Sequence, residues 1–226
     1  MASKKVAEVV EIKPIEIVTA SIRIQGDTPL IMHRWSEKAK RMILDKEMGK
    51  SEVKKHPVKN PVEDFIDSLY WVSEKPDVDN TTEEDAENMF NTAVDNGAQW
   101  GFPVTAIKAA AVSAAFRNGY SKDKVSLQGS FFIDGTGDEL LEEVKGCVPH
   151  IREDMVRVGM GSADIRHRGE FDGWYMDLTI RFNKNGKMRL TDICNIINLG
   201  GFSCGIGEWR PEKGGSYGMY HVVASK

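Results

Sequence analysis

Glycine, basic and aromatic residues are concentrated in one short stretch of the sequence, residues 200–222, GGFSCGIGEWRPEKGGSYGMYHV. A run of glycines indicates that the backbone comes close to something, which here could be a phosphate chain, a nucleotide cofactor or a neighbouring strand. A dinucleotide-binding loop follows a strand and opens a helix, whereas here a helix is expected before the glycines and a strand after them, and P-loop spacing is missing. The stretch could therefore lie along a phosphate backbone or against a neighbouring subunit. The structural alternative is a tight helix-to-strand turn. Its candidate binding residues are Gly205, Gly207, Trp209, Arg210 and Lys213.

Two further segments combine basic side chains with residues that can contact bases. Binding of a single strand requires cations for the phosphates and flat side chains for the bases, and each stacked base contributes roughly 1–3 kcal/mol. The segment MHRWSEKAKR supplies Arg34, Trp35, Lys38 and Arg41. The segment 150–168, HIREDMVRVGMGSADIRHR, supplies Arg152, Arg157, Arg166 and Arg168, with Met155 and Met160 between them. We expect the second segment to form a thumb-like hairpin that wedges between bases.

These segments also have structural alternatives. Arg152 and Arg157 could pair with nearby carboxylates on a solvated surface, and those carboxylates are Glu153, Asp154 and Asp164. Trp35 and Trp209 each adjoin an arginine, as a stacking platform does, but a buried tryptophan beside a solvated arginine gives the same pattern. The core is the expected place of two other tryptophans, Trp100 and Trp174.

The sequence gives little support for catalysis. The histidines show no metal-ligand spacing with the three cysteines, and no serine lies in a nucleophile elbow. These histidines are His33, His56, His150, His167 and His221. His33 could act as a general acid–base, and Asp27 or Asp164 could hold a metal ion, but each stands without a second candidate group beside it. We therefore expect no catalytic residue, metal or cofactor.

Periodicity and capping signals predict the elements that would position these residues. The strands are expected at 17–25, 124–133, 173–182 and 217–223. The first helices are expected at 36–49, from Asn60-Pro61 onward, and around 86–94 in an acidic loop (73–98). A further helix is expected at 105–118, with Thr105 as its cap. The last is expected after Thr191, with Ile193, Ile196 and Ile197 on one face. Without the segments 34–100 and 135–170, the order is strand, helix, strand, strand, helix, strand. We therefore expect a single α+β domain, 1–226, with a ferredoxin-like (RRM-like) βαββαβ core, two large insertions at those segments and a C-terminal glycine-rich loop.

Composition and charge narrow the class of protein. The 226 residues are 41% hydrophobic and 28% charged, which is ordinary for a soluble globular protein. No apolar run could span a bilayer, and charges interrupt the amino-terminal MASKKVAEVVEIKP where a signal peptide needs an apolar stretch. Three cysteines argue against a disulfide scaffold, so a cytoplasmic location is expected. The net charge of −4 hides a basic segment (34–59) followed by an acidic one (63–95), which suits one binding face and one partner-facing face.

Three motifs, in the expected order, resemble the RAMP superfamily (repeat-associated mysterious proteins), which includes the backbone subunits of CRISPR effector complexes. The first strand closes with IQGDTPLIM, the helix opens with FPVTAIKAAAVSA, and the glycine-rich GGFSCGIGEW…GGSYG lies near the carboxyl end. In the helix, Thr105, Ile107 and Lys108 fall on the family's Ser, Leu and Lys. The compact size and GEWRPEKGG look more like an orphan branch carried by phages or mobile elements.

The resemblance implies binding of single-stranded nucleic acid along the sheet and glycine loop, with Lys108 among the contacts, and stacking of copies along the strand. RNA would follow from the CRISPR likeness and single-stranded DNA from a phage recombination role. The location would be cytoplasmic, in the bacterial host cell if a phage encodes the chain. We therefore expect a non-enzymatic, homo-oligomeric single-strand binder that does not enter membranes. One alternative is a phage assembly factor or inhibitor that uses the acidic segment. A second is an endoribonuclease of the same superfamily, with His33 as its acid–base group.

Overall fold

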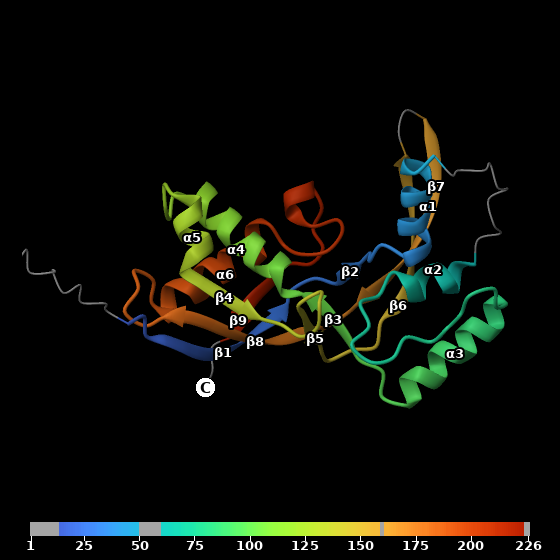
Figure 1. Cartoon of the computed structure of the whole chain (residues 1–226), viewed down its shortest axis with the longest axis horizontal. Helices are drawn as coiled ribbons and strands as arrows, with labels where there is room; N and C mark the ends of the chain where they lie inside the picture. The colour runs from blue at the N-terminus through green and yellow to red at the C-terminus, as the bar shows by residue number, and fades with distance from the viewer. Residues whose placement is uncertain (1–13, 50–59, 159–160, 224–226) are drawn as a thin grey trace, which may run out of the picture.

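The chain has an α+β fold with antiparallel sheets in its computed structural model, which describes residues 14–49, 60–158 and 161–223 (Figure 1). The strands are β1 (Ile17–Gly26), β2 (Leu30–Met32), β3 (Trp100–Pro103), β4 (Phe131–Asp134), β5 (Leu141–Val144), β6 (His150–Val158), β7 (Ser162–Phe171), β8 (Tyr175–Asn183) and β9 (Tyr220–Val223). The helices are α1 (Glu37–Glu47), α2 (Pro61–Asp67), α3 (Glu83–Asp95), α4 (Val104–Arg117), α5 (Lys124–Ser130), α6 (Leu190–Ser203) and the 3-10 turn η1 (Pro211–Lys213). Over these described ranges, no helix has the length and apolar character needed to cross a membrane.

A four-stranded antiparallel sheet occupies one end of the molecule, with strand order β4-β8-β1-β9. Side chains alternate along β8, so that Met176, Leu178 and Ile180 are fully buried. Helices α4, α5 and α6 lie over one side of this sheet (Figure 1). Helices α4 and α6 approach closely, because a Cβ on Gly200 would lie only 2.7 Å from the backbone nitrogen of Ala111. The small residues of α4 therefore permit the close helix contact that covers the core.

The other end of the molecule is built around a long hairpin. Strands β6 and β7 pair from His150↔Glu170 to Val158↔Ser162, and β2 joins the other edge of β7. Helix α1 runs beside this hairpin in Figure 1, with α2 and α3 near its base. The Ser68 hydroxyl, just after α2, accepts a hydrogen bond from the backbone N–H of Gly169 (2.9 Å), which attaches the helix to β7. This arrangement places β2, β7 and the carboxyl-terminal loop next to one another.

The predicted strands at 17–25 and 173–182 and the helix at 105–118 are present, and the first and second predicted strands share one sheet. The prediction of a strand at 124–133 is wrong over its first seven residues, because the Asp123 carboxylate accepts hydrogen bonds from Val125 N and Ser126 N and starts α5. Thr105 does not cap α4, since the helix already begins at Val104.

The glycine stretch also differs from its predicted layout. Helix α6 begins at Leu190, so Thr191 lies inside its first turn, and the helix runs through the first two glycines to Ser203. The final strand is shorter than predicted and begins at Tyr220, because the η1 turn and the loop around it occupy the preceding residues. His56 and Met160 lie outside the described residues.

Candidate functional site

The loop 204–218, which carries five of the seven glycines of the stretch 200–222, packs on itself and on β2. Ile206 N and Gly218 O are joined by a hydrogen bond of 2.9 Å. A Cβ on Gly218 would lie 1.8 Å from Ile206 O, and a Cβ on Gly207 would lie 2.5 Å from Ile31 O. Both glycines also have positive φ, which side-chain-bearing residues rarely adopt. The glycines are therefore required by the close approach of the loop to its own backbone and to a neighbouring strand.

Trp209 lies in this loop with a left-handed backbone (φ 51°), a conformation that costs a non-glycine residue roughly 1–2 kcal/mol. Two contacts hold it: Tyr217 N donates to Trp209 O (3.0 Å), and Trp209 Nε1 donates to Asp154 Oδ2 (3.3 Å). The side chain is nevertheless not enclosed, and Trp209 remains 41% exposed. Strained residues of this kind cluster at binding sites, so the ring is a candidate contact surface.

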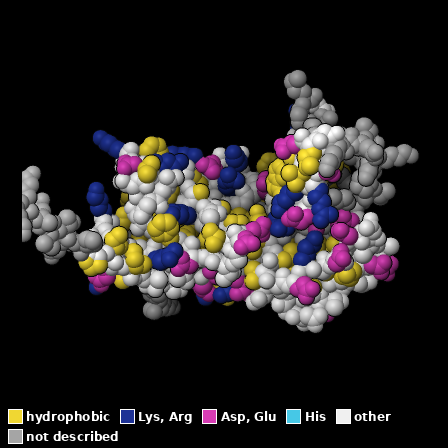
Figure 2. Space-filling view, viewed as in Figure 1, with side chains coloured by type: hydrophobic (Ala, Val, Ile, Leu, Met, Phe, Trp, Pro, Cys, Tyr) yellow, Lys and Arg dark blue, Asp and Glu magenta, His cyan; other side chains and the backbone are white. Residues whose placement is uncertain are grey.

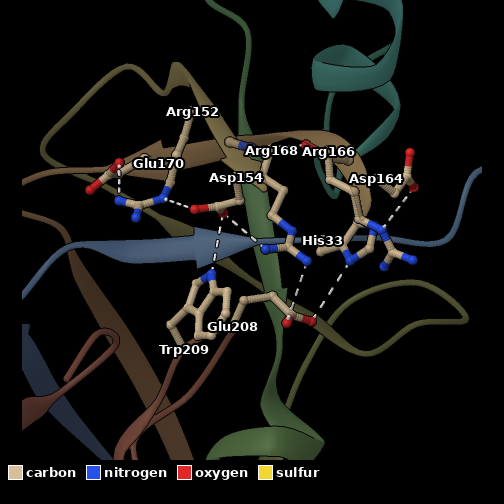
Figure 3. A network of polar contacts seen from close by, with 11 residues as sticks. His33, Arg152, Asp154, Asp164, Arg166, Arg168, Glu170, Glu208 and Trp209 are labelled. Atoms are coloured by element: carbon tan, nitrogen blue, oxygen red, sulfur yellow. Dashed lines mark hydrogen bonds and ion pairs between the residues drawn. The ribbon is translucent and has the colours of Figure 1, made fainter. Parts of the chain in front are cut away.

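Asp154 is the centre of a network that joins the hairpin to this loop (Figure 3). Its carboxylate, on a residue that is only 8% exposed, accepts hydrogen bonds from Arg152 Nε and Arg168 Nη1, both at 2.9 Å. Arg152 also donates to Glu170 Oε2 (3.0 Å). Burial alone would raise the pKa of Asp154, but hydrogen bonds from the two arginines and the Trp209 indole outweigh this effect and lower it. Arg152 and Arg168 are therefore held by carboxylates. The Arg152–Asp154 pair of the structural alternative is present, but its carboxylate is buried and not on a solvated surface.

A cavity of about 650 Å³ lies between α4, the start of α5 and the loop 204–218. Lys108 and Lys124 line it, and neither has an ion pair with a carboxylate among the described residues. Lys108 Nζ lies 4.0 Å from the centroid of the Phe132 ring, and burial lowers the pKa of this lysine. The apolar part of the lining includes Tyr70, Phe102, Ala106, Ala109 and Ile206. The cavity therefore offers positive charge beside an apolar wall.

A second hollow, of about 520 Å³, lies between α1, α2 and β7. Arg34, Trp35 and Arg166 line it, and Trp35 is 58% exposed. Both hollows are lined by His33 and Glu208, so they meet at these two side chains. We refer to the two hollows together as the groove. In the space-filling view, basic and acidic side chains adjoin one another where the hairpin leaves the body of the molecule (Figure 2).

The predicted site residues fall into four groups. The 650 Å³ cavity brings together Lys108, Gly205, Gly207 and Arg210, and the second hollow brings together Arg34, Trp35 and Arg166. The Asp154 network holds Arg152, Arg168 and Trp209. Three residues line neither hollow and are exposed: Arg41, Arg157 and Lys213. The side chain of Lys38, on α1, is outside the described part.

Several of the predicted cations have carboxylate partners. Arg34 Nε lies 3.2 Å from Glu139 Oε1, and Arg166 Nε lies 3.6 Å from Asp164 Oδ2. Arg210 Nη1 donates to Gly207 O (3.0 Å) and its Nε to a Glu212 carboxylate oxygen (3.3 Å), which fixes the loop. The cations of the groove thus divide into arginines paired with carboxylates, which shape it, and lysines with no carboxylate partner in the described ranges, which can contact a ligand.

Two residues of the groove were missed from the sequence. Lys124 is the first residue of α5, and its assignment to a strand hid its place at the cavity. Glu208 lies at the junction, with Oε1 3.8 Å from His33 Nδ1 and Oε2 3.8 Å from Arg168 Nη2. Its position next to Trp209 in GEWR was an available signal, but a carboxylate is not expected in a site chosen for phosphates.

The groove can bind a ligand through charge, hydrogen bonds and aromatic contact. Among the residues that the structure describes, no three His, Cys, Asp or Glu side chains are close enough together to hold a metal ion. The groove is lined by basic and acidic side chains together: Lys108, Lys124, Arg210, Arg34 and Arg166, and Glu208, Glu212, Asp64, Asp67 and Asp164. No model of a known protein family matches the chain, and no curated protein sequence matches it significantly either.

Proposed function

We propose that this chain is a non-enzymatic protein that binds single-stranded nucleic acid in the groove. The observation that carries the proposal is that His33 and Glu208 line both hollows, so the cavity with Lys108 and Lys124 adjoins the hollow with Trp35. Lys108 and Lys124 at one end have no described carboxylate partner and so are available to phosphates. Trp35 at the other end, and Trp209 beside the groove, are exposed rings on which bases can stack.

The proposal extends to the fold family. The sheet order β4-β8-β1-β9, with α4 between β1 and β4 and α6 between β8 and β9, supports a ferredoxin-like core in which the remaining elements are insertions. We propose that the chain is an orphan member of the RAMP superfamily, as its three motifs suggest. Copies would then stack along the bound strand, since one such core covers only a few nucleotides.

The test is binding of a fluorescently labelled single-stranded oligonucleotide, as RNA and as DNA, at two salt concentrations. Each phosphate contact releases counterions, so the logarithm of affinity should fall with the logarithm of salt, with a slope of about −0.7 per contact. Replacing Lys124 with Ala should make this slope shallower by about 0.7, because one contact is lost. Lys122→Ala is the matched control, since Lys122 is exposed two residues away and does not line the cavity.

Three outcomes would contradict the proposal. The first is no binding at low salt, and the second is tighter binding to duplex than to single strands. The third is cleavage of the RNA, which would instead support the endoribonuclease alternative with the His33–Glu208 pair as its acid–base groups. Equal effects of Lys124→Ala and Lys122→Ala would remove the cavity from the binding site.

A second candidate function is supported by α3. Several of its carboxylates are exposed, and none of those on the described surface of the helix pairs with a lysine or arginine: Glu83, Glu84, Glu87 and Asp95. Such a face could bind a basic protein partner, as an assembly factor or an inhibitor that imitates nucleic acid would. A pull-down from bacterial lysate with and without nuclease separates the two functions, because a protein partner bound through α3 would survive nuclease treatment.

A further inference from the structure

Glu208 lies where the two hollows adjoin, and a carboxylate is unexpected there because the proposed ligand is a polyanion. Its backbone N–H donates to Ile31 O (3.0 Å), so its place beside β2 is fixed. Its carboxylate oxygens lie 3.8 Å from His33 Nδ1 and from Arg168 Nη2, beyond ordinary hydrogen-bond length. Figure 3 shows each oxygen facing one of these two side chains, and because a carboxylate oxygen has two lone pairs, each can still accept a hydrogen bond from a ligand in the groove.

The charge of Glu208 restricts what it can contact. Its contact with His33, which outweighs the effect of burial, lowers its pKa, so the side chain is ionised at neutral pH. An ionised carboxylate only accepts hydrogen bonds and repels phosphate. The part of a bound strand that lies against Glu208 must therefore present N–H or O–H donors.

Among the bases, guanine presents the best match to a carboxylate. Its N1–H and N2–H groups are adjacent and parallel, and so can donate to both oxygens of one carboxylate. The corresponding edges of adenine, cytosine and uracil each place a ring nitrogen or carbonyl acceptor next to the donor, and that acceptor repels the carboxylate. The cavity beside Glu208 has an apolar wall for the face of a purine, which includes Tyr70, Phe102, Ala106 and Ile206.

We infer that the 650 Å³ cavity binds a guanine base of the strand, with the Glu208 carboxylate accepting hydrogen bonds from guanine N1–H and N2–H. This inference rests on the proposed function. His33 and Arg168 position the carboxylate, and Lys108 lies on the same cavity for a phosphate of the same nucleotide. The bound strand thus has one guanine-selective position per copy of the protein.

The test compares oligothymidines of one length that carry a single guanosine, inosine or adenosine. Inosine lacks only the N2 amino group, so it tests the bidentate contact without any change to the protein. The wild-type protein should bind the guanosine strand roughly 5- to 150-fold more tightly than the inosine or adenosine strand. In Glu208→Gln the ratio should fall to about one, because the amide N–H₂ would face the donors of guanine. Glu87→Gln should retain the preference, since Glu87 is exposed on α3 and lines neither hollow.

The outcomes separate this inference from the function on which it rests. Strand binding with equal affinity for guanosine and inosine overturns the inference and leaves the proposed function in place. No strand binding at low salt overturns the proposed function. A separate experiment measures binding of guanosine 5′-monophosphate alone by quenching of tryptophan fluorescence. If the protein binds this nucleotide but no strand, the cavity is a site for a free nucleotide. A uniform loss of binding to all strands in Glu208→Gln would show a structural role and overturn the inference.

Discussion

Replacing Asp154 with Asn should destabilise the protein far more than removal of a surface carboxylate. The Asp154 carboxylate accepts hydrogen bonds from Arg152 (2.9 Å), Arg168 (2.9 Å) and Trp209 (3.3 Å), and Arg168 is only 3% exposed. Loss of one partner of a buried ion pair leaves an uncompensated charge and costs about 3–5 kcal/mol. Asn keeps one acceptor oxygen, so we expect the lower end of this range, about 3 kcal/mol. The free energy of unfolding from urea titration at pH 7 measures it.

The control and the pH dependence sharpen this test. Asp177 on β8 pairs with Arg23 (2.7 Å) and Lys145 (3.3 Å), but its side chain is 31% exposed, so Asp177→Asn should cost about 1 kcal/mol. The folded-state pKa of Asp154 is lower than its unfolded value, so its contribution is complete at neutral pH and is lost as the pH falls below about 4. The stability curves of wild type and Asp154→Asn should therefore converge in acid. Equal losses in the two variants at pH 7, or a difference that grows in acid, would refute the reasoning.

Three further predictions concern other parts of the chain. Gly218→Ala should lower the free energy of unfolding by more than about 2 kcal/mol, because its Cβ would lie 1.8 Å from Ile206 O. Gly214 also has a left-handed backbone but has open space around it, so Gly214→Ala should lower the free energy of unfolding by only about 1 kcal/mol. Equal losses of the two variants in urea titrations would contradict this prediction. Cys147, whose pKa burial raises to about 11, should react with iodoacetamide at a rate that still rises between pH 8 and pH 10, and a plateau below pH 9 by peptide mass spectrometry would contradict the burial effect. Assemblies seen by light scattering should lengthen with the length of an added single strand, whereas one copy per strand at every length would exclude stacking, and unchanged assembly in a Trp209→Ala, Arg210→Ala double variant would exclude a role for the loop.

Elements whose signals are local could be predicted from the sequence. The alanine-rich body of α4 and the alternation along β1 and β8 determine their own conformations, because helix propensity and period-two patterning act over a few residues. The start of α5 shows where such patterns mislead. Residues 124–133 alternate like a strand, but two hydrogen bonds to the Asp123 carboxylate favour a helical turn over its first seven residues.

The candidate site could be predicted only in its residue types. Trp35 and the loop glycines are predicted because their chemistry suits a nucleic-acid strand, and Lys108 because of the RAMP resemblance; the structure brings several of them to the groove. The partners of the arginines could not be deduced in full, because the pairing of Arg168 with Asp154 depends on the register of β6 and β7. The place of Glu208 in the site could not be predicted for a related reason, since only the packing of the loop on β2 brings it to His33.

The central place of β1 in the sheet has a consequence for the order of events during synthesis. Its partners β8 and β9 belong to the last third of the sequence, and the paired residues Arg23 and Asp177 are 154 positions apart. At 5–20 residues per second, β1 waits about 8–30 s after translation before its first neighbour in the sheet exists. The hairpin β6–β7 can close within microseconds of its own synthesis. The pairing of β1 with β8 is slower, because it closes a loop that contains most of the chain and this closure has an entropic cost. The hairpin can therefore pair before the four-stranded sheet does, and β1, which is translated early, completes its pairing late.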